Sequence, residues 1–126
     1  MFGSDIIRVK IKGFLKNITD NDILNFDEKG IKNKNKISFV KDEIKYFIMI
    51  HNNMIEVVRE TDEYVNSFVF DKDKASSLYT LKEFNQTLEI KLMINSLDIE
   101  EDSFDINYTV LDTSCSYELK MEIKLL

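Results

Sequence analysis

The sequence predicts an all-β protein, a single antiparallel up-and-down β-barrel of about eight to ten strands. First, apolar and polar residues alternate from Ile6 to Leu126 with the period of two that marks a half-buried strand. Second, polar turns separate these segments at intervals of about 10 residues, which is typical of sandwiches and barrels. Third, no segment resembles a crossover helix, which excludes a parallel α/β sheet. Closure into a barrel would also remove exposed strand edges.

The strands of the N-terminal third are the less regular ones. In the first strand, Ile7, Val9 and Ile11 share one face, and Arg8, Lys10 and Lys12 share the other. The expected strands are Asp5–Lys16, Ile23–Lys32 and Ile37–Val40. Polar residues end them at Thr19–Asp22, within 30–36 and at Lys41–Glu43.

From Ile44 onward the alternation is clearer. Inward-facing rows are expected at Ile44–Ile50, Ile55–Arg59, Tyr64–Phe70, Thr87–Asn95, Phe104–Val110 and Tyr117–Leu125. Asn52-Asn53 is expected to form a two-residue hairpin turn, because Asn tolerates positive φ. A turn is also expected at Glu100–Ser103. The stretch Ala75–Phe84 stays open, since it fits one helical turn, a strand or a loop.

Composition predicts one folded domain, 1–126. The 44% of hydrophobic and 32% of charged residues form an ordinary globular balance, and this length supports a core without disulfides or metals. The lone Cys115 cannot form an internal disulfide, and Met1–Lys10 lacks the apolar core of a signal peptide. No apolar run approaches the roughly 20 residues that cross a bilayer. We therefore expect a cytoplasmic protein with no membrane partner.

Charge disfavours nucleic acid as a partner, because the net charge is −6 and the sequence pI is near 4.8. Residues 1–45 carry 10 Lys and Arg against 7 Asp and Glu, so they account for +3 and the remainder for −9. In a barrel this predicts a two-toned surface that can steer a protein partner or a second copy. The basic set Lys29, Lys32, Lys34 and Lys36 lacks the stacking aromatics of a nucleic-acid site and reads as a solvated hairpin.

The order of residues from Gly30 onward carries a resemblance to a family. Its stretches are Gly30-Ile31, Ile48–Arg59, Val65–Phe70, Tyr79-Thr80, Leu88–Leu97 and Ile106–Tyr108. They resemble the YwiB-like family, a group of small bacterial proteins of uncharacterised function. The resemblance implies a calycin-like, lipocalin-type barrel and no activity. The chain departs from the family at Glu60-Thr61, which follow Arg59 in place of x-Gly, and at Lys82–Asn85, where the family tends to have Pro-Tyr-Gly, so it looks like a divergent member.

Arg59 is the residue that most invites a functional interpretation. It shares a strand face with Ile55 and Val57, and an unpaired charge on a buried face is costly. It would either clamp an anion at the barrel mouth, or pair with a carboxylate on a neighbouring strand or reach past the rim. The second interpretation is favoured. Among the five tyrosines, Tyr79 and Tyr108 are the candidates for ring surface around a ligand.

Other chemical patterns are weak. His51 has no partnered Ser or Cys and is expected to be solvated, and Asp71-x-Asp73 lacks the glycine and glutamate of a calcium loop. No cofactor, metal or catalytic residue is therefore expected. The leading hypothesis is a non-enzymatic barrel that binds a small amphipathic or anionic ligand through Arg59, Tyr79 and Tyr108. The alternatives are an interaction or homodimerisation module and, least favoured, an enzyme that uses Arg59 with a carboxylate.

Overall fold

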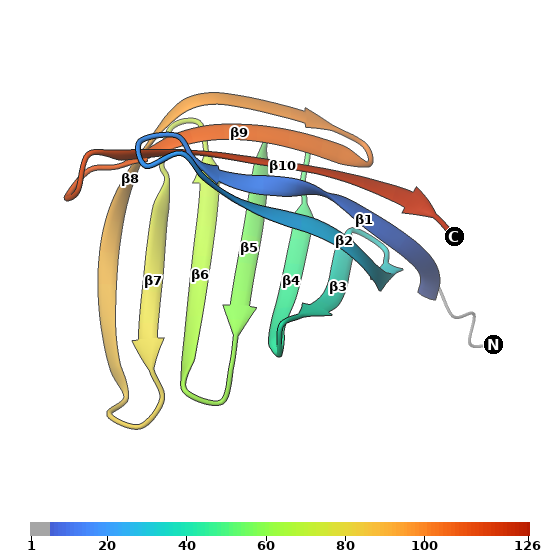
Figure 1. The fold of residues 1–126 in the computed structure, drawn as a ribbon, viewed down its shortest axis with the longest axis horizontal. Coiled ribbons are helices and arrows are strands. Elements are labelled where there is room, and N and C mark those ends of the chain that lie inside the picture. The colour runs from blue at the N-terminus through green and yellow to red at the C-terminus, as the bar shows by residue number, and fades with distance from the viewer. Residues whose placement is uncertain (1–5) are drawn as a thin grey trace.

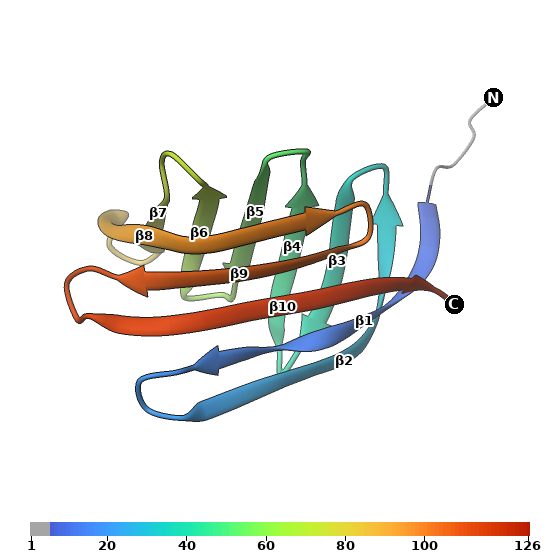
Figure 2. The ribbon, with the colours of Figure 1, turned by 90° about the horizontal axis from the view of Figure 1, so that it is seen from above.

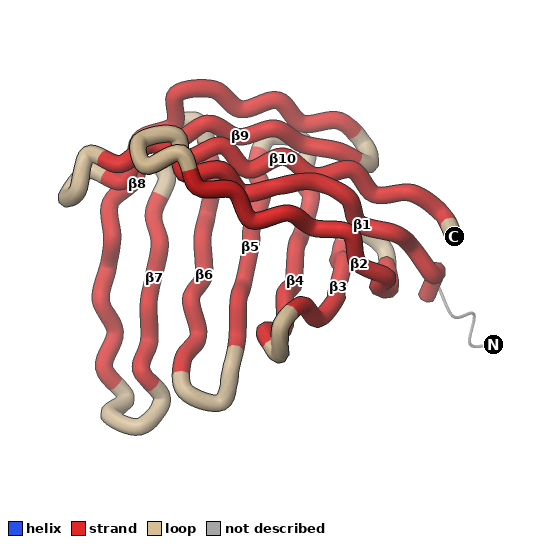
Figure 3. The backbone as a smooth tube through the Cα atoms, in the orientation of Figure 1, coloured by secondary structure: helices blue, strands red, loops and turns tan. Residues whose placement is uncertain are grey.

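The structure, a computed structural model, describes residues 6–126. Within this range it is all-β and forms ten strands and no helix (Figure 3). The strands are β1 (Ile6–Asn17), β2 (Asp22–Asn33), β3 (Lys36–Lys41), β4 (Ile44–Ile50), β5 (Met54–Glu60), β6 (Tyr64–Asp71), β7 (Ser76–Leu81), β8 (Gln86–Glu100), β9 (Ser103–Val110) and β10 (Cys115–Leu125). Asp5, the expected start of the first strand, lies outside the described residues.

The ten strands close into one antiparallel barrel. Each strand pairs with its neighbours in the chain, and β1 also pairs with β10, so the predicted up-and-down topology is confirmed. The strands β9, β10, β1 and β2 form one layer, the upper sheet, and β3 to β7 form a lower sheet that runs across it (Figures 1 and 2). The long β8 joins the two, and its register with β9 shifts between Ile94 and Ser96.

Apolar side chains fill the space between the two sheets. The buried residues follow the predicted alternation, for example Phe104, Ile106 and Tyr108 on β9 and Leu119, Met121 and Ile123 on β10. Phe39 and Tyr46 stack with ring centroids 4.8 Å apart, and Phe26 meets both rings edge-on. Most of the barrel interior is therefore a packed core.

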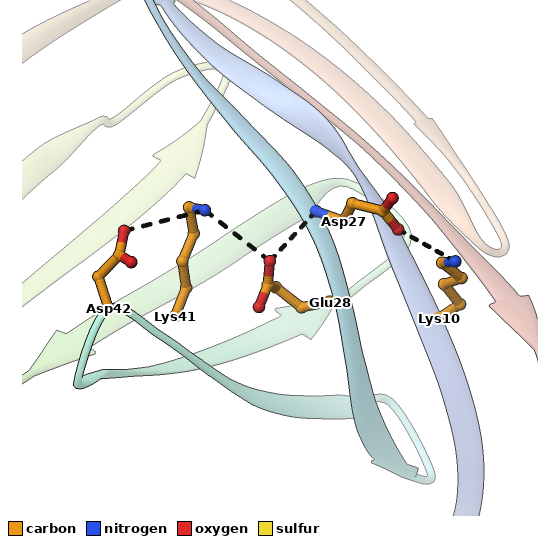
Figure 4. Close-up of polar contacts among 5 residues, drawn as sticks. All are labelled: Lys10, Asp27, Glu28, Lys41 and Asp42. Carbon is orange, nitrogen blue, oxygen red and sulfur yellow. Dashed lines mark hydrogen bonds and ion pairs between the residues drawn. The ribbon is translucent and has the colours of Figure 1, made fainter.

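The barrel is most weakly closed between β2 and β3. Only Gly30–Asn33 of β2 pair with β3, so the first part of β2 has no strand partner on that side. Side chains bridge the divergence instead: Lys41 Nζ lies 3.8 Å from Glu28 Oε2 and 3.9 Å from Asp42 Oδ2 (Figure 4). On the other side of β2, Lys10 Nζ lies 3.2 Å from Asp27 Oδ1.

The structure corrects the expected turn after β4 and settles the stretch 75–84, which the sequence left open. The hairpin after β4 forms, and His51 N donates to Met54 O at 2.9 Å, but neither Asn52 nor Asn53 has the positive φ that was expected. Positive φ occurs instead at Asn21, Lys34, Asp42, Glu43, Asn85 and Ser114. The open stretch 75–84 is strand β7 followed by a turn at 82–85. No helix of residues 6–126 has the length and apolar character needed to cross a membrane.

Candidate ligand-binding site

Arg59 lies inside the barrel because of its place on β5. It follows Ile55 and Val57 at intervals of two, and both of those side chains are buried. Its partners across the strands are Tyr46 on β4 and Asn66 on β6. The guanidinium carbon lies 5.6 Å from the centre of the Tyr46 ring, which is cation–π geometry. The predicted inward face of Arg59 is therefore where the structure places it.

The charge of Arg59 has no carboxylate partner among residues 6–126. Its Nε is buried and donates no hydrogen bond, and none of the described ion pairs involves Arg59. The favoured sequence interpretation offered either an ion pair with a neighbouring strand or a side chain that reaches past the rim. The ion pair does not form among the described residues, because the cross-strand neighbours are a phenol and an amide. A cation inside a barrel without a counter-charge is costly unless something else supplies one.

A small cavity lies beside Arg59. Its volume is about 30 Å³, and its wall is apolar except for Arg59 and the tyrosine hydroxyls. The lining residues come from both sheets and are Leu15, Phe26, Tyr46, Val57, Arg59, Phe68, Phe70, Tyr108, Leu119 and Met121. Such a space holds about one water or the oxygens of a carboxylate, and it is too small for a chain or ring. A ligand could place only its head group there.

Tyr108 lines the same cavity from the upper sheet. Its side chain is 5% exposed and packs against Phe70 and Tyr117, with ring centroids 4.9 and 5.3 Å away. Burial, and next the neighbouring Tyr117, raise the pKa of Tyr108, while Arg59 opposes the rise. The hydroxyl therefore stays protonated at neutral pH and can donate a hydrogen bond to an anion beside Arg59.

Tyr79 lies farther out along the same inner row. Asn66 separates it from Arg59, so the two residues are two strands, about 10 Å, apart. It stacks on Tyr64 with centroids 5.3 Å apart. Its neighbour Leu88 is 65% exposed although it faces the inside, because the lower ends of β6, β7 and β8 extend beyond the upper sheet (Figure 1). Tyr79 thus belongs to an open apolar surface that the polar Asn66 separates from Arg59.

Acidic turns surround this open end. The turns after β3, β5 and β7 carry Asp42, Glu43, Asp62, Glu63 and Glu83. Two lysines offset part of this charge: Lys82 Nζ lies 2.8 Å from Glu60 Oε2, and Lys45 lies beside the same acidic turns. The Lys82 ammonium lowers the pKa of Glu60. An approaching ligand therefore meets a negative rim before it meets Arg59.

The remaining sequence candidates are occupied or isolated. His51 is half-buried rather than solvated, and its Nε2 lies 2.9 Å from Glu56 Oε2, a contact that requires knowledge of the hairpin register. The Asp71 carboxylate accepts from Asp73 N within its own turn. In the basic set, Lys32 pairs with Asp102 and Lys36 lies over Phe47. No group of three or more potential metal-ligating His, Cys, Asp or Glu residues occurs within residues 6–126.

The fold and its open end define a class, a closed ten-stranded β-barrel with a packed core and with Arg59 in its lumen. No family model matches the sequence, and no curated protein matches it. Among solved structures, the chain is similar to the ywiB protein from Bacillus subtilis, with a TM-score of 0.66 and 15% identity over 98% of this chain and 93% of that one. The protein thus has a YwiB-like fold, as the sequence resemblance implied.

Proposed function

We propose that this protein is a non-enzymatic, cytoplasmic binding protein whose barrel holds a small organic anion with an apolar body. Its carboxylate would sit between Arg59 and Tyr108, and its body would lie over Tyr79 and Leu88. We also place it in the YwiB-like family and among the calycin-like barrels. The observation that carries the proposal is Arg59, a cation in the lumen without a carboxylate partner among the described residues.

Head-group chemistry supports a carboxylate. A guanidinium offers paired N–H donors that match two carboxylate oxygens, and the Tyr108 hydroxyl adds a third donor from the opposite sheet. The counter-charge would come from the ligand, so binding would compensate the half-buried cation. The cavity of about 30 Å³ suits this head group and nothing larger.

The surroundings support a monoanion with an apolar body. Tyr64, Tyr79 and Leu88 offer ring and aliphatic surface at the open end. The acidic residues Asp42, Glu43 and Asp62 would repel a polyanion such as a nucleotide or sugar phosphate. A fatty acid of medium length has one charge and the required apolar area.

Titration with decanoate, followed by calorimetry, tests this function. The unmodified protein should bind decanoate at least about tenfold more tightly than decanol, which lacks the charge. Arg59→Met should remove that preference, since the variant keeps the volume and loses the cation. Arg8→Met is the matched control, because Arg8 is the chain's other arginine and is exposed on β1.

Two outcomes would reject the proposal. One is absence of decanoate binding to protein whose native mass shows no bound molecule already in the barrel. The other is equal decanoate affinity in Arg59→Met and Arg8→Met. Circular dichroism of both variants shows that a loss is not a folding defect, and replacing a buried charge by an apolar side chain of similar size is often neutral for stability.

A further inference from the structure

A second concave surface lies at the end of the barrel away from the acidic turns. Three hairpins meet there: the β2–β3 turn at 34–35, the β4–β5 turn at 51–53 and the β8–β9 turn at 101–102 (Figures 1 and 2). They border an open surface cleft of about 450 Å³. This volume lies within the roughly 300–1,000 Å³ of small-molecule sites, whereas the cavity at Arg59 is far smaller.

The floor of the cleft is aliphatic. Ile37 on β3, Ile50 on β4 and Ile99 on β8 line it. Ile37 is fully buried and the other two are half-buried, so the floor belongs to the core and keeps its shape without a ligand. An apolar group that settles on the half-buried Ile50 and Ile99 would be removed from water, and the buried Ile37 supports them from below.

Opposite charges stand on different hairpins around this floor. Lys34 belongs to the β2–β3 turn, and Glu100 and Glu101 lie at the β8–β9 turn. None of the three takes part in an ion pair between described residues. Their neighbours are already satisfied, since Lys32 Nζ lies 2.7 Å from Asp102 Oδ1 and His51 Nε2 lies 2.9 Å from Glu56 Oε2. The cleft therefore presents one available cation and two available carboxylates.

We propose that this cleft binds a short peptide of two or three residues by its two free termini. Lys34 would hold the C-terminal carboxylate, Glu100 and Glu101 would hold the N-terminal ammonium, and an aliphatic side chain would cover Ile50 and Ile99. A simple anion would face the two carboxylates, and a simple cation would face Lys34. A free amino acid carries both charges on one carbon, whereas the cleft offers them from separate hairpins. The site is independent of the one at Arg59.

Titration of ¹⁵N-labelled protein with the dipeptide Leu-Leu tests the proposal. Amide signals of residues around the three turns should shift, and those near Arg59 should not. Acetyl-Leu-Leu and Leu-Leu-amide, which each lack one charged terminus, should bind about tenfold more weakly. No shifts with Leu-Leu, or equal binding of the blocked and free peptides, would overturn the assignment.

Variants separate the two walls of the cleft. Lys34→Glu should weaken Leu-Leu binding about tenfold, and Glu101→Lys should do the same. Lys29→Glu is the matched control, because Lys29 is exposed on β2 and does not line the cleft, and its effect should stay below about twofold. Equal effects of Lys34→Glu and Lys29→Glu would mean that the weaker binding comes from the change in net charge, and this would refute the site. Saturating decanoate should leave Leu-Leu binding unchanged, because the two sites are separate. The decanoate and Leu-Leu titrations therefore test the two proposals independently.

Discussion

At the residue scale, two carboxyl groups share a place on the outer surface of the upper sheet. Asp105 on β9 has a buried Oδ1 without a hydrogen-bond donor among the described residues. Glu118 on β10 lies diagonally across from it, since Glu118 pairs with Asn107 and Asp105 pairs with Lys120. A hydrogen bond with Asp105, then burial and the repulsion of the Asp105 charge, raise the pKa of Glu118. Protonation of Glu118 is therefore easier in the folded than in the unfolded protein.

A raised pKa of Glu118 sets the sign of a stability change. Below the unfolded pKa both states are protonated and the shared proton stabilises the fold; as pH rises through the folded pKa this contribution is lost. Glu118→Gln should thus stabilise the protein at pH 7, because it removes the repulsion, and the gain should vanish toward pH 4. Urea unfolding at both pH values measures this. Glu122→Gln is the control, because Glu122 lies on the same strand face on the other side of Lys120, where its Oε2 is 3.9 Å from Lys124 Nζ. An equal or larger gain there would contradict the account.

Gly13 is a residue at which any side chain would break strand pairing. It lies on β1 opposite Met121 of β10, and a Cβ built there would overlap the carbonyl oxygen of Lys120. The obstacle is backbone and cannot rotate away. We expect Gly13→Ala to destabilise the fold by about 1–3 kcal/mol, the usual range for overpacking. Urea denaturation measures the loss, and Lys12→Ala, at the exposed neighbouring position, should cost less than about 1 kcal/mol.

At the element scale, the strands could be predicted because each has one buried and one exposed face. In rows such as Phe104, Ile106 and Tyr108, the period of two is visible in the sequence itself. The end of β8 could not be predicted in the same way. The register shift after Ile94 moves the inward face to Leu97 and Ile99, which breaks the alternation. The alternation therefore predicts a strand that ends at Asn95, whereas β8 continues to Glu100.

In the candidate site too, features that depend on residue spacing could be predicted, and features that depend on strand pairing could not. The inward face of Arg59 follows from the spacing of Ile55 and Val57. The absence of a carboxylate beside it depends on which residues of β4 and β6 lie opposite, and these are Tyr46 and Asn66. The approach of Tyr108 depends on the upper sheet crossing the lower one (Figure 2). A single sequence specifies neither the strand register nor the crossing of the sheets, so it cannot decide between an ion pair for Arg59 and a side chain that reaches past the rim.

At the scale of the whole molecule, the exposed charges around the open end of the barrel are opposite in sign to the charge inside it. The turns that carry Asp42, Glu43, Asp62 and Glu63 surround the open end, and the only described cation inside it without an ion pair is Arg59. A carboxylate that binds Arg59 therefore experiences long-range repulsion from exposed groups and short-range attraction from a half-buried one. Salt acts on these two forces unequally, because it screens exposed charges more strongly than buried ones.

This inequality predicts how salt affects ligand binding. Raising NaCl from about 0.05 to 0.5 M shortens the Debye length below about 10 Å and weakens the repulsion by the rim, while the contact with Arg59 is largely kept. The ratio of decanoate to decanol affinity should then change by less than about twofold, with decanol correcting for the effect of salt on apolar transfer. Calorimetric titration of both ligands at both concentrations measures the ratio. A fall of about tenfold would mean that decanoate is held by exposed lysines rather than by Arg59 inside the barrel.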